Sequence, residues 1–125
     1  MTAAATVLID TSVWADHFRA GDAALVALLN DGRARMHPYV VGELAMGNIA
    51  NRARTIALLR AVPSIAPVDE DAWLSFVERE ELGGSGLGYV DTHLLAAAHV
   101  AGAALWTRDR RLAARAAKLE SAWAG

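Results

Sequence analysis

The amino-acid sequence predicts a single α/β domain, in which helices cover both faces of a small parallel sheet. Short runs at residues 7–9 and 103–107 are apolar almost throughout, as strands buried on both faces are. Segments with helical spacing of apolar residues separate these runs, and such alternation is typical of parallel sheets. Hydrophobic residues make up 54% of the chain and charged residues 21%, a balance that favours a globular fold over disorder.

The chain length favours one domain. A chain of 125 residues can bury a core of its own, and we find no linker or internal repeat. We therefore expect residues 1–125 to form a three-layer α/β/α domain around a central, mainly parallel sheet of four to five short strands. The apolar share is high for so small a chain, which favours an interface with a second copy or a partner.

The expected strands are short and are bounded by turn-forming or polar residues. In chain order they cover residues 7–9, 34–37, 63–68 and 103–107. The first is the most distinctive, because three branched apolar residues stop abruptly at Asp10. In open α/β sheets the carboxyl ends of the strands form the crevice that holds ligands, so an acid at this place is a candidate functional residue.

Seven helices are expected between and after these strands. They cover residues 12–18, 23–30, 39–48, 52–61, 69–82, 90–101 and 110–119. Thr11 or Ser12 is available to cap the first helix, and Gly32 is a suitable stop for the second. Pro38 opens the third at a position that tolerates proline, and Glu43 lies beside the apolar stripe of that helix.

The later helices are delimited in the same way. The helix that begins near Asp69 has acids in its first turn, where they interact favourably with the helix dipole. The glycine-rich passage at residues 83–88 follows a helix rather than a strand, which favours a C-cap and a mobile loop over a phosphate-binding loop. Gly102 ends the next helix, and the last one begins after Asp109.

Composition excludes several classes of protein. The absence of cysteine removes disulfides, zinc-thiolate sites and thiol nucleophiles. No segment has the length of a membrane span, and the N-terminus lacks the pattern of a secretory signal. We therefore expect a cytoplasmic protein that does not span a membrane. The net charge of −2 gives no overall basic signature of nucleic-acid binding. Lys118 is the only lysine among twelve basic residues, and arginine favours local contacts with phosphate.

Four carboxylates stand out by position: Asp10, Glu43, Asp91 and Asp109. Parallel strands end at the same edge, so we expect Asp10 and Asp109 to meet there and Asp91 to join them from the start of its helix. Taken singly, N-capping accounts for Asp91 and Asp109. Taken together, clustered carboxylates repel in a half-buried crevice, and a divalent cation removes that repulsion. An all-oxygen cluster without cysteine or paired histidines selects Mg²⁺ or Mn²⁺ over zinc.

The segments around these acids carry a familiar pattern. They are Val7-Leu8-Ile9-Asp10-Thr11-Ser12, Val41-Gly42-Glu43-Leu44, Val90-Asp91-Thr92-His93-Leu94-Leu95-Ala96-Ala97-Ala98 and Leu105-Trp106-Thr107-Arg108-Asp109-Arg110-Arg111-Leu112. Over nearly its full length the chain resembles PIN-domain nucleases, and more narrowly VapC-type toxins of bacterial toxin–antitoxin modules. The resemblance implies a Mg²⁺-dependent endoribonuclease that cleaves RNA with metal-activated water, forms a homodimer and is inhibited by a VapB-like antitoxin.

The resemblance also implies roles for individual residues. The acidic site would consist of Asp10, Glu43, Asp91 and Asp109. Asp10 and Asp91 would bind the metal directly, whereas Glu43 and Asp109 would bind it directly or through water. Three hydroxyl residues would orient carboxylates or water, namely Thr11, Ser12 and Thr107.

Four further residues are candidate RNA contacts. Arg108, Arg110 and Arg111 flank Asp109 and are suited to phosphate, although ordinary helix-surface charges explain them equally well. Trp14 is suited to stacking on a base at the crevice rim, with a place in the core as the alternative.

Two other functions compete with a nuclease. A phosphoacceptor signalling domain needs adjacent acids after its first strand and a lysine at a later strand end, but Thr11 follows Asp10 and Lys118 lies near the C-terminus. A catalytically silent PIN-like interaction protein would keep the fold without using the site.

Overall fold

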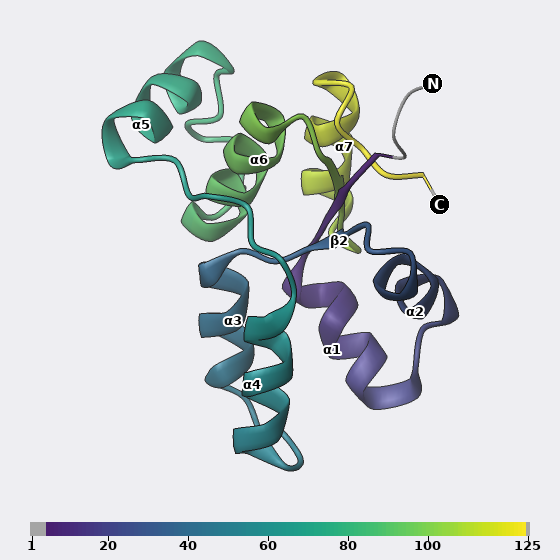
Figure 1. The fold of residues 1–125 in the computed structure, drawn as a ribbon. Helices are drawn as coiled ribbons and strands as arrows, with labels where there is room; N and C mark the ends of the chain where they lie inside the picture. Colours follow the sequence, from purple (N-terminus) through teal and green to yellow (C-terminus); the bar gives the residue numbers. More distant parts are fainter. Residues whose placement is uncertain (1–4, 125) are drawn as a thin grey trace.

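The computed structural model describes residues 5–124, whose central feature is a small parallel sheet (Figure 1). Its strands are β1 (Val7–Ile9), β2 (Ala34–Arg35) and β3 (Ala104–Trp106), in the order β2-β1-β3. Both neighbours run parallel to β1, and Val7 pairs with Ala34 on one side and with Ala104 on the other. The α/β class and the parallel sheet are therefore confirmed.

The expected number of four to five strands is wrong, because residues 5–124 form a sheet of three. The segment at residues 63–68 makes one isolated parallel bridge, between Ser64 and Met36, instead of a strand. Two prolines lie in this short segment, and proline has no N–H to donate to a sheet. At the other edge of the sheet, Ala122 makes a single bridge with Leu105. Pairing thus continues outward on both sides, but only as one bridge each.

Helices form where the apolar spacing predicts them. They are α1 (Thr11–Ala20), α2 (Ala23–Asn30), α3 (Pro38–Ala45), α4 (Arg52–Ala61), α5 (Glu70–Arg79), α6 (Tyr89–Ala101) and α7 (Arg110–Lys118). Helix α3 ends earlier than expected, at Ala45, just before Gly47. The Arg52 guanidinium donates to the carbonyl oxygens of Ala45 and Gly47, which satisfies groups that a helix end leaves without partners.

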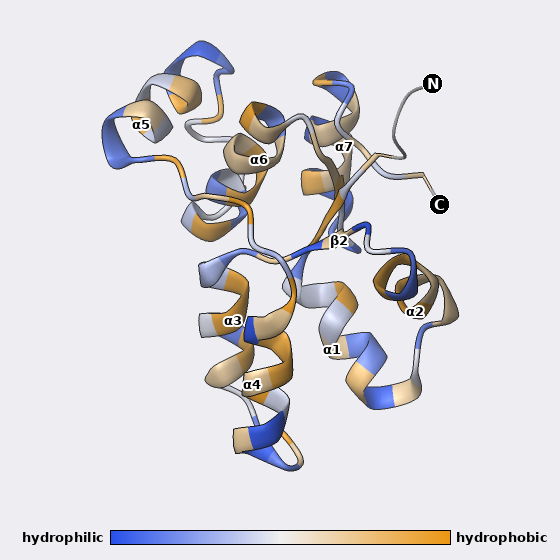
Figure 2. Cartoon of the chain, viewed as in Figure 1, coloured by the Kyte–Doolittle hydropathy of each residue, from blue (hydrophilic) through white to orange (hydrophobic). Residues whose placement is uncertain are grey.

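Helices cover both faces of the sheet. Val7, Leu8 and Ile9 are each fully buried, and successive side chains of a strand point to opposite faces. Helix α6 packs on β1 and β3, α7 on β3, and α2 on β2. Figure 1 shows α3 and α4 side by side, extending away from the sheet. In Figure 2, hydrophilic residues gather where α1 meets α2 and at the end of α5, while β1 is hydrophobic.

None of the helices in residues 5–124 combines the length and the apolar character needed to cross a membrane.

The strand order β2-β1-β3 brings two chain segments together at the carboxyl edge of the sheet. The backbone N–H of Asp10 donates to the carbonyl oxygen of Trp106 at 2.9 Å, which extends the β1–β3 pairing by one residue. The residues that follow β1 and β3 are therefore direct neighbours.

Candidate active site

Asp10 lies at the centre of this edge and is 5% exposed. Its Oδ2 atom accepts hydrogen bonds from Ser12 Oγ and from Thr107 Oγ1, both at 2.7 Å. Such short distances are typical of hydroxyl groups that donate to an ionised carboxylate. Ser12 comes from the start of α1 and Thr107 from the end of β3, so two separate elements fix one carboxylate.

The direction of these two hydrogen bonds is set by the backbone. The N–H of Arg108 donates to Ser12 Oγ, and the N–H of Asp109 donates to Thr107 Oγ1, both at 3.0 Å. Each hydroxyl oxygen thus accepts from an amide and gives its own proton to Asp10. Within residues 5–124 no donor contacts the other oxygen, Oδ1, which leaves that atom available for a ligand.

The N-cap of α1 differs from the expectation. Asp10 occupies the N-cap position, whereas we expected Thr11 or Ser12 there. Asp10 makes no side-chain cap bond, because its carboxylate accepts the two hydroxyls instead. Thr11 and Ser12 are the first residues of the helix, and both of their hydroxyls donate to carboxylates rather than cap the backbone amides of α1.

Glu43 reaches the same region from α3. Thr11 Oγ1 donates to Glu43 Oε1 at 2.6 Å, and this bond connects α1 with α3. Glu43 is exposed to solvent, so its position beside the apolar stripe of α3 has not buried it. The structure therefore holds Glu43 through a hydroxyl of the neighbouring helix.

Asp91 lies in the first turn of α6 and is half-buried. Burial raises the pKa of its carboxyl group above the ordinary value, and the negative charges of Asp10, Asp109 and Glu43 raise the pKa further, against a lowering by the Gly88 backbone. The four acids are therefore close enough to interact electrostatically. N-capping does not explain Asp91, because Gly88 is the N-cap of α6.

Asp109 serves in part as the cap that its position suggested. It is the N-cap of α7, and its Oδ1 accepts from the backbone N–H groups of Arg111 and Leu112 at 2.9 and 3.0 Å. Residue Asp109 is exposed to solvent. It is thus held rigidly at the rim by one oxygen.

The candidate RNA contacts separate into different environments. Arg108 is engaged by two carboxylates, since its guanidinium lies 2.7 Å from Asp16 and 2.6 Å from Asp22. These ion pairs tie the β3–α7 connection to α1 and to the start of α2. Arg110 and Arg111 are exposed. Trp14 is 4% exposed, which corrects the idea that its ring stacks on a base: it belongs to the core.

The donor set fits a hydrated divalent cation. Among residues 5–124, no three acidic or imidazole side chains are gathered closely enough to enclose an ion by themselves. Mg²⁺ does not require such a cage, because it keeps several water ligands and uses one or two carboxylates. The half-buried Asp91 among three other acids is a site where a cation relieves repulsion.

Sequence reasoning missed a polar and aromatic cluster behind Asp91. His93 is fully buried, its ring stacks on that of Trp73 with centroids 5.1 Å apart, and its Nε2 lies 2.9 Å from Glu70 Oε1. The Tyr89 hydroxyl donates to the same Glu70 oxygen. His93 is thus a packed residue of the interior. Its partners on α5 lie about twenty residues away, and no local signal in the sequence connects them.

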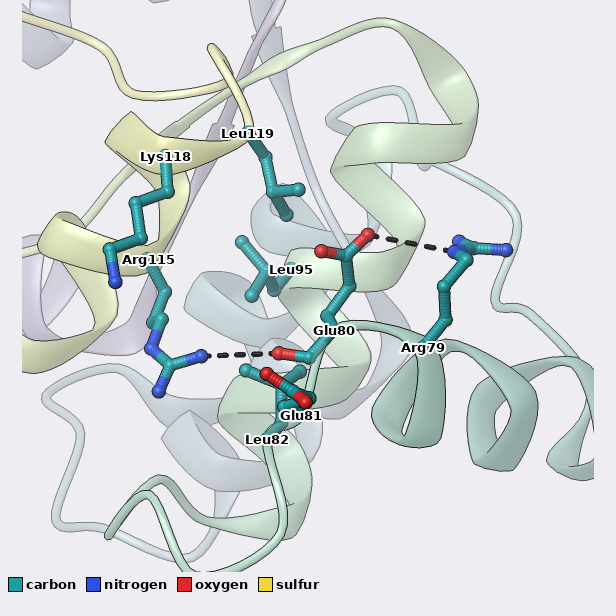
Figure 3. A pocket seen from close by; sticks show the side chains of 8 residues that line it. All are labelled: Arg79, Glu80, Glu81, Leu82, Leu95, Arg115, Lys118 and Leu119. Carbon is teal, nitrogen blue, oxygen red and sulfur yellow. Dashed lines mark hydrogen bonds and ion pairs between the residues drawn. The ribbon is translucent and has the colours of Figure 1, made fainter.

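A separate hollow of about 250 Å³ lies between the end of α5, α6 and α7 (Figure 3). Leu82 and Leu95 are among the residues that line it, and none of the four acids does. Two of its charged side chains pair with each other, Arg79 and Glu80, and Arg115 donates to the carbonyl oxygen of Glu80. This hollow is distinct from the acidic site.

Comparison with known proteins agrees with the fold. The family model described as PIN domain matches residues 7–119. The chain belongs to the PIN domain family. Within that family it is of the VapC type: it is 49% identical over 113 residues to Ribonuclease VapC32 from two strains of Mycobacterium tuberculosis. That alignment covers 90% of this chain and 91% of the relative.

A solved structure shows the same PIN fold at much lower sequence similarity. The crystal structure of PAE2754 from Pyrobaculum aerophilum superposes with a TM-score of 0.61 and 16% identity. The match covers 93% of this chain and 90% of that chain. At this identity the likeness concerns the fold alone.

Proposed function

We propose that this VapC-type PIN protein is a Mg²⁺-dependent endoribonuclease and the toxin of a toxin–antitoxin pair. The observation that carries the proposal is the Asp10 carboxylate, which two hydroxyls hold by one oxygen beside three further acids. The 49% identity to Ribonuclease VapC32 supports RNA as the substrate. Mn²⁺ is an alternative cation, because the same all-oxygen donors suit it.

In this proposal Asp10 and Asp91 hold the cation directly, and Glu43 and Asp109 hold it directly or through water. A bound divalent cation supplies activated water and stabilises the charge of the leaving oxygen. The protein supplies orientation: Ser12 and Thr107 fix Asp10, and Thr11 fixes Glu43. Asp91, whose pKa is raised in the free protein, becomes a better ligand as a cation offsets its neighbours' charges.

The test is cleavage of total RNA by the purified protein with Mg²⁺ or Mn²⁺. We expect cleavage that EDTA abolishes and that Asp10→Asn reduces by more than about 100-fold, since even outer-shell changes cost 10–100-fold. Asp71→Asn, at an exposed position in the first turn of α5, is the control and should stay within about two-fold of wild type. Equal activity of Asp10→Asn would point to a contaminating nuclease.

The cleaved ends test the chemistry. Attack by water should leave 5′-phosphate and 3′-hydroxyl ends, which ligation-based sequencing of the products distinguishes. Cyclic phosphate ends would mean that the ribose 2′-hydroxyl is the nucleophile, and would refute this part of the proposal.

We infer that the protein partner is a VapB-like antitoxin. We also infer that the protein encounters this partner and its RNA substrate in the cytoplasm. A cluster of four acids is a natural receptor for an arginine of a partner peptide, because guanidinium–carboxylate pairs are strong and directional. Expression with the neighbouring gene product should yield a complex in which nuclease activity is lost. A protein that cells tolerate well when it is expressed alone would count against the toxin role but not against the nuclease.

A homodimer is the oligomeric state we propose. Large apolar side chains are exposed on three helices, with Leu58 60%, Leu74 51% and Val100 73% exposed, and burying apolar surface of this kind between two copies is favourable. Light scattering after size-exclusion chromatography should give twice the chain mass of 13.2 kDa. A monomer at micromolar concentration would contradict this proposal.

A further inference from the structure

The glycine-rich loop at residues 83–88, between α5 and α6, contacts an arginine of α7. The backbone of Gly86 has φ +87°, and a methyl group added to it would lie 2.5 Å from Arg111 Nη1 and 3.4 Å from Arg111 Cζ. Real Cβ atoms are not found so close to another heavy atom. The Arg111 guanidinium therefore occupies space that exists only because residue 86 has no side chain.

The same loop touches the acidic site. A methyl group added to Gly88, two residues after Gly86, would lie 3.8 Å from Asp91 Oδ2. Two residues span at most about 7 Å between Cα atoms, and each added methyl group lies about 1.5 Å from its Cα, so the Arg111 guanidinium lies within roughly 17 Å of the Asp91 carboxylate. Arg111 is also tied to Asp109, whose Oδ1 accepts its backbone N–H at 2.9 Å. The guanidinium thus lies against a loop that also borders Asp91, and its backbone lies beside Asp109.

The charge of Arg111 is available for a ligand. In the part of the chain that the structure describes, no carboxylate lies within 4 Å of its guanidinium, whereas Asp16 and Asp22 engage that of Arg108. An approaching RNA strand meets four negative side chains at the site. A cation beside this loop offsets part of that repulsion and offers paired N–H donors that match a phosphate.

We propose that Arg111, seated on Gly86, binds a backbone phosphate of the RNA next to the phosphate that is cleaved. The glycine loop acts as the support that positions this guanidinium, so Gly86 is a positioning residue and Arg111 a substrate-binding residue. This inference rests on the proposed ribonuclease function and adds one specific contact with the substrate backbone to it.

The experiment measures KM and kcat for a short single-stranded RNA with Mg²⁺ at several salt concentrations. Arg111→Ala should raise KM about tenfold and change kcat less than about threefold, because the contact positions substrate away from the reacting atoms. The slope of log KM against log salt should fall by about 0.7, the value for one phosphate contact on a single strand. Arg111→Lys should keep the wild-type salt slope, but its KM should lie between those of wild type and Arg111→Ala.

Two matched controls isolate the contact. Arg54→Ala removes the same charge from an exposed position on α4, outside the candidate RNA contacts, and it should leave KM within about twofold of wild type. Gly86→Ala should displace the guanidinium and reproduce the KM and salt slope of Arg111→Ala. Gly84 has a similar backbone conformation, φ +75°, but open space around it. Gly84→Ala therefore carries the conformational cost of a side chain at positive φ without displacing Arg111. Thermal unfolding shows that each variant is folded.

Equal effects of Arg111→Ala and Arg54→Ala would overturn the phosphate contact. Equal effects of Gly86→Ala and Gly84→Ala would overturn the positioning role of Gly86. Direct binding of the same RNA, followed by fluorescence anisotropy in EDTA, keeps the two proposals distinguishable. Wild-type protein that binds RNA with the Arg111-dependent salt slope but cleaves none would refute the nuclease and support the contact. Cleavage with no dependence on Arg111 would do the reverse.

Discussion

Replacing Asp91 by asparagine should make the protein more stable while it removes activity. The Asp91 carboxyl group is half-buried, and its pKa is raised first by burial and then by the charge of Asp10, with Asp109 and Glu43 adding to it. Asparagine has the same shape without the charge, and its oxygen can still accept the Gly88 backbone hydrogen bond. The substitution therefore removes repulsion and the cost of burying a charge.

The magnitude follows from two opposing terms. Loss of a negative charge from the first turn of α6 costs about 0.3–1 kcal/mol through the helix dipole. Removing the repulsion and the cost of burying a charge stabilises the protein by more than this loss. Single substitutions that replace a destabilised functional group typically stabilise a protein by about 0.5–2 kcal/mol. We expect a net gain of about 1 kcal/mol, which raises Tm by about 3–5 °C in a domain of this size.

The assay is thermal unfolding at pH 7 in EDTA and again with Mg²⁺. Asp91→Asn should unfold at a higher temperature than wild type in EDTA, and Mg²⁺ should stabilise wild type more than the variant. Asp71→Asn, an exposed acid in the first turn of α5, loses the dipole contribution without gaining relief, so its Tm should be unchanged or slightly lower. A lower Tm of Asp91→Asn in EDTA would refute the reasoning.

The pH dependence provides a second check on Asp91. A carboxyl group with a raised pKa binds a proton more tightly in the folded protein than in the unfolded chain, whose value is 3.8. As the pH falls through the raised pKa towards 3.8, the contribution of Asp91 to stability therefore increases. Asp91→Asn should lack this contribution, so the difference in Tm between the variant and wild type should shrink in acid.

Two further predictions concern Thr107 and His37. Thr107→Val removes one of the two donors to Asp10 and should lower activity about 10–100-fold with the fold retained, whereas Thr55→Val on α4, which loses a bond to the Ala50 carbonyl, should leave activity unchanged. An unaffected rate would show that Thr107 does not orient Asp10. Burial, with a smaller effect of His93, lowers the pKa of His37 to about 4. The unfolded chain therefore binds more protons than the folded protein between pH 4 and 6.5, and the free energy of unfolding should fall by up to about 3 kcal/mol as the pH drops through this range. His37→Asn can keep the cap to the Tyr39 N–H, and urea unfolding at pH 5 and 7 should show a smaller pH effect. An equal pH effect in the variant would contradict this.

The order and type of the secondary-structure elements follow from local signals. Apolar spacing, Pro38 and Gly102 act within a few residues of each position, so all the expected helices form, with ends that shift by a few residues. The number of strands does not follow from such signals. Whether residues 63–68 pair as a strand depends on which N–H groups face the neighbouring segment, and here one bridge forms.

The candidate site divides in the same way. The sequence places Asp10 at the end of a buried strand, and the order of the strands implies that it meets the residues after β3. The hydroxyl that holds Asp10 from β3, on Thr107, lies 97 residues along the chain, and its geometry depends on the packing of α1 against that connection. The burial of Trp14 and the seat of Arg111 on Gly86 depend equally on how distant elements pack. Residue type and local spacing thus determine which groups the chain can offer, whereas packing between elements far apart in sequence determines which of them can meet a ligand.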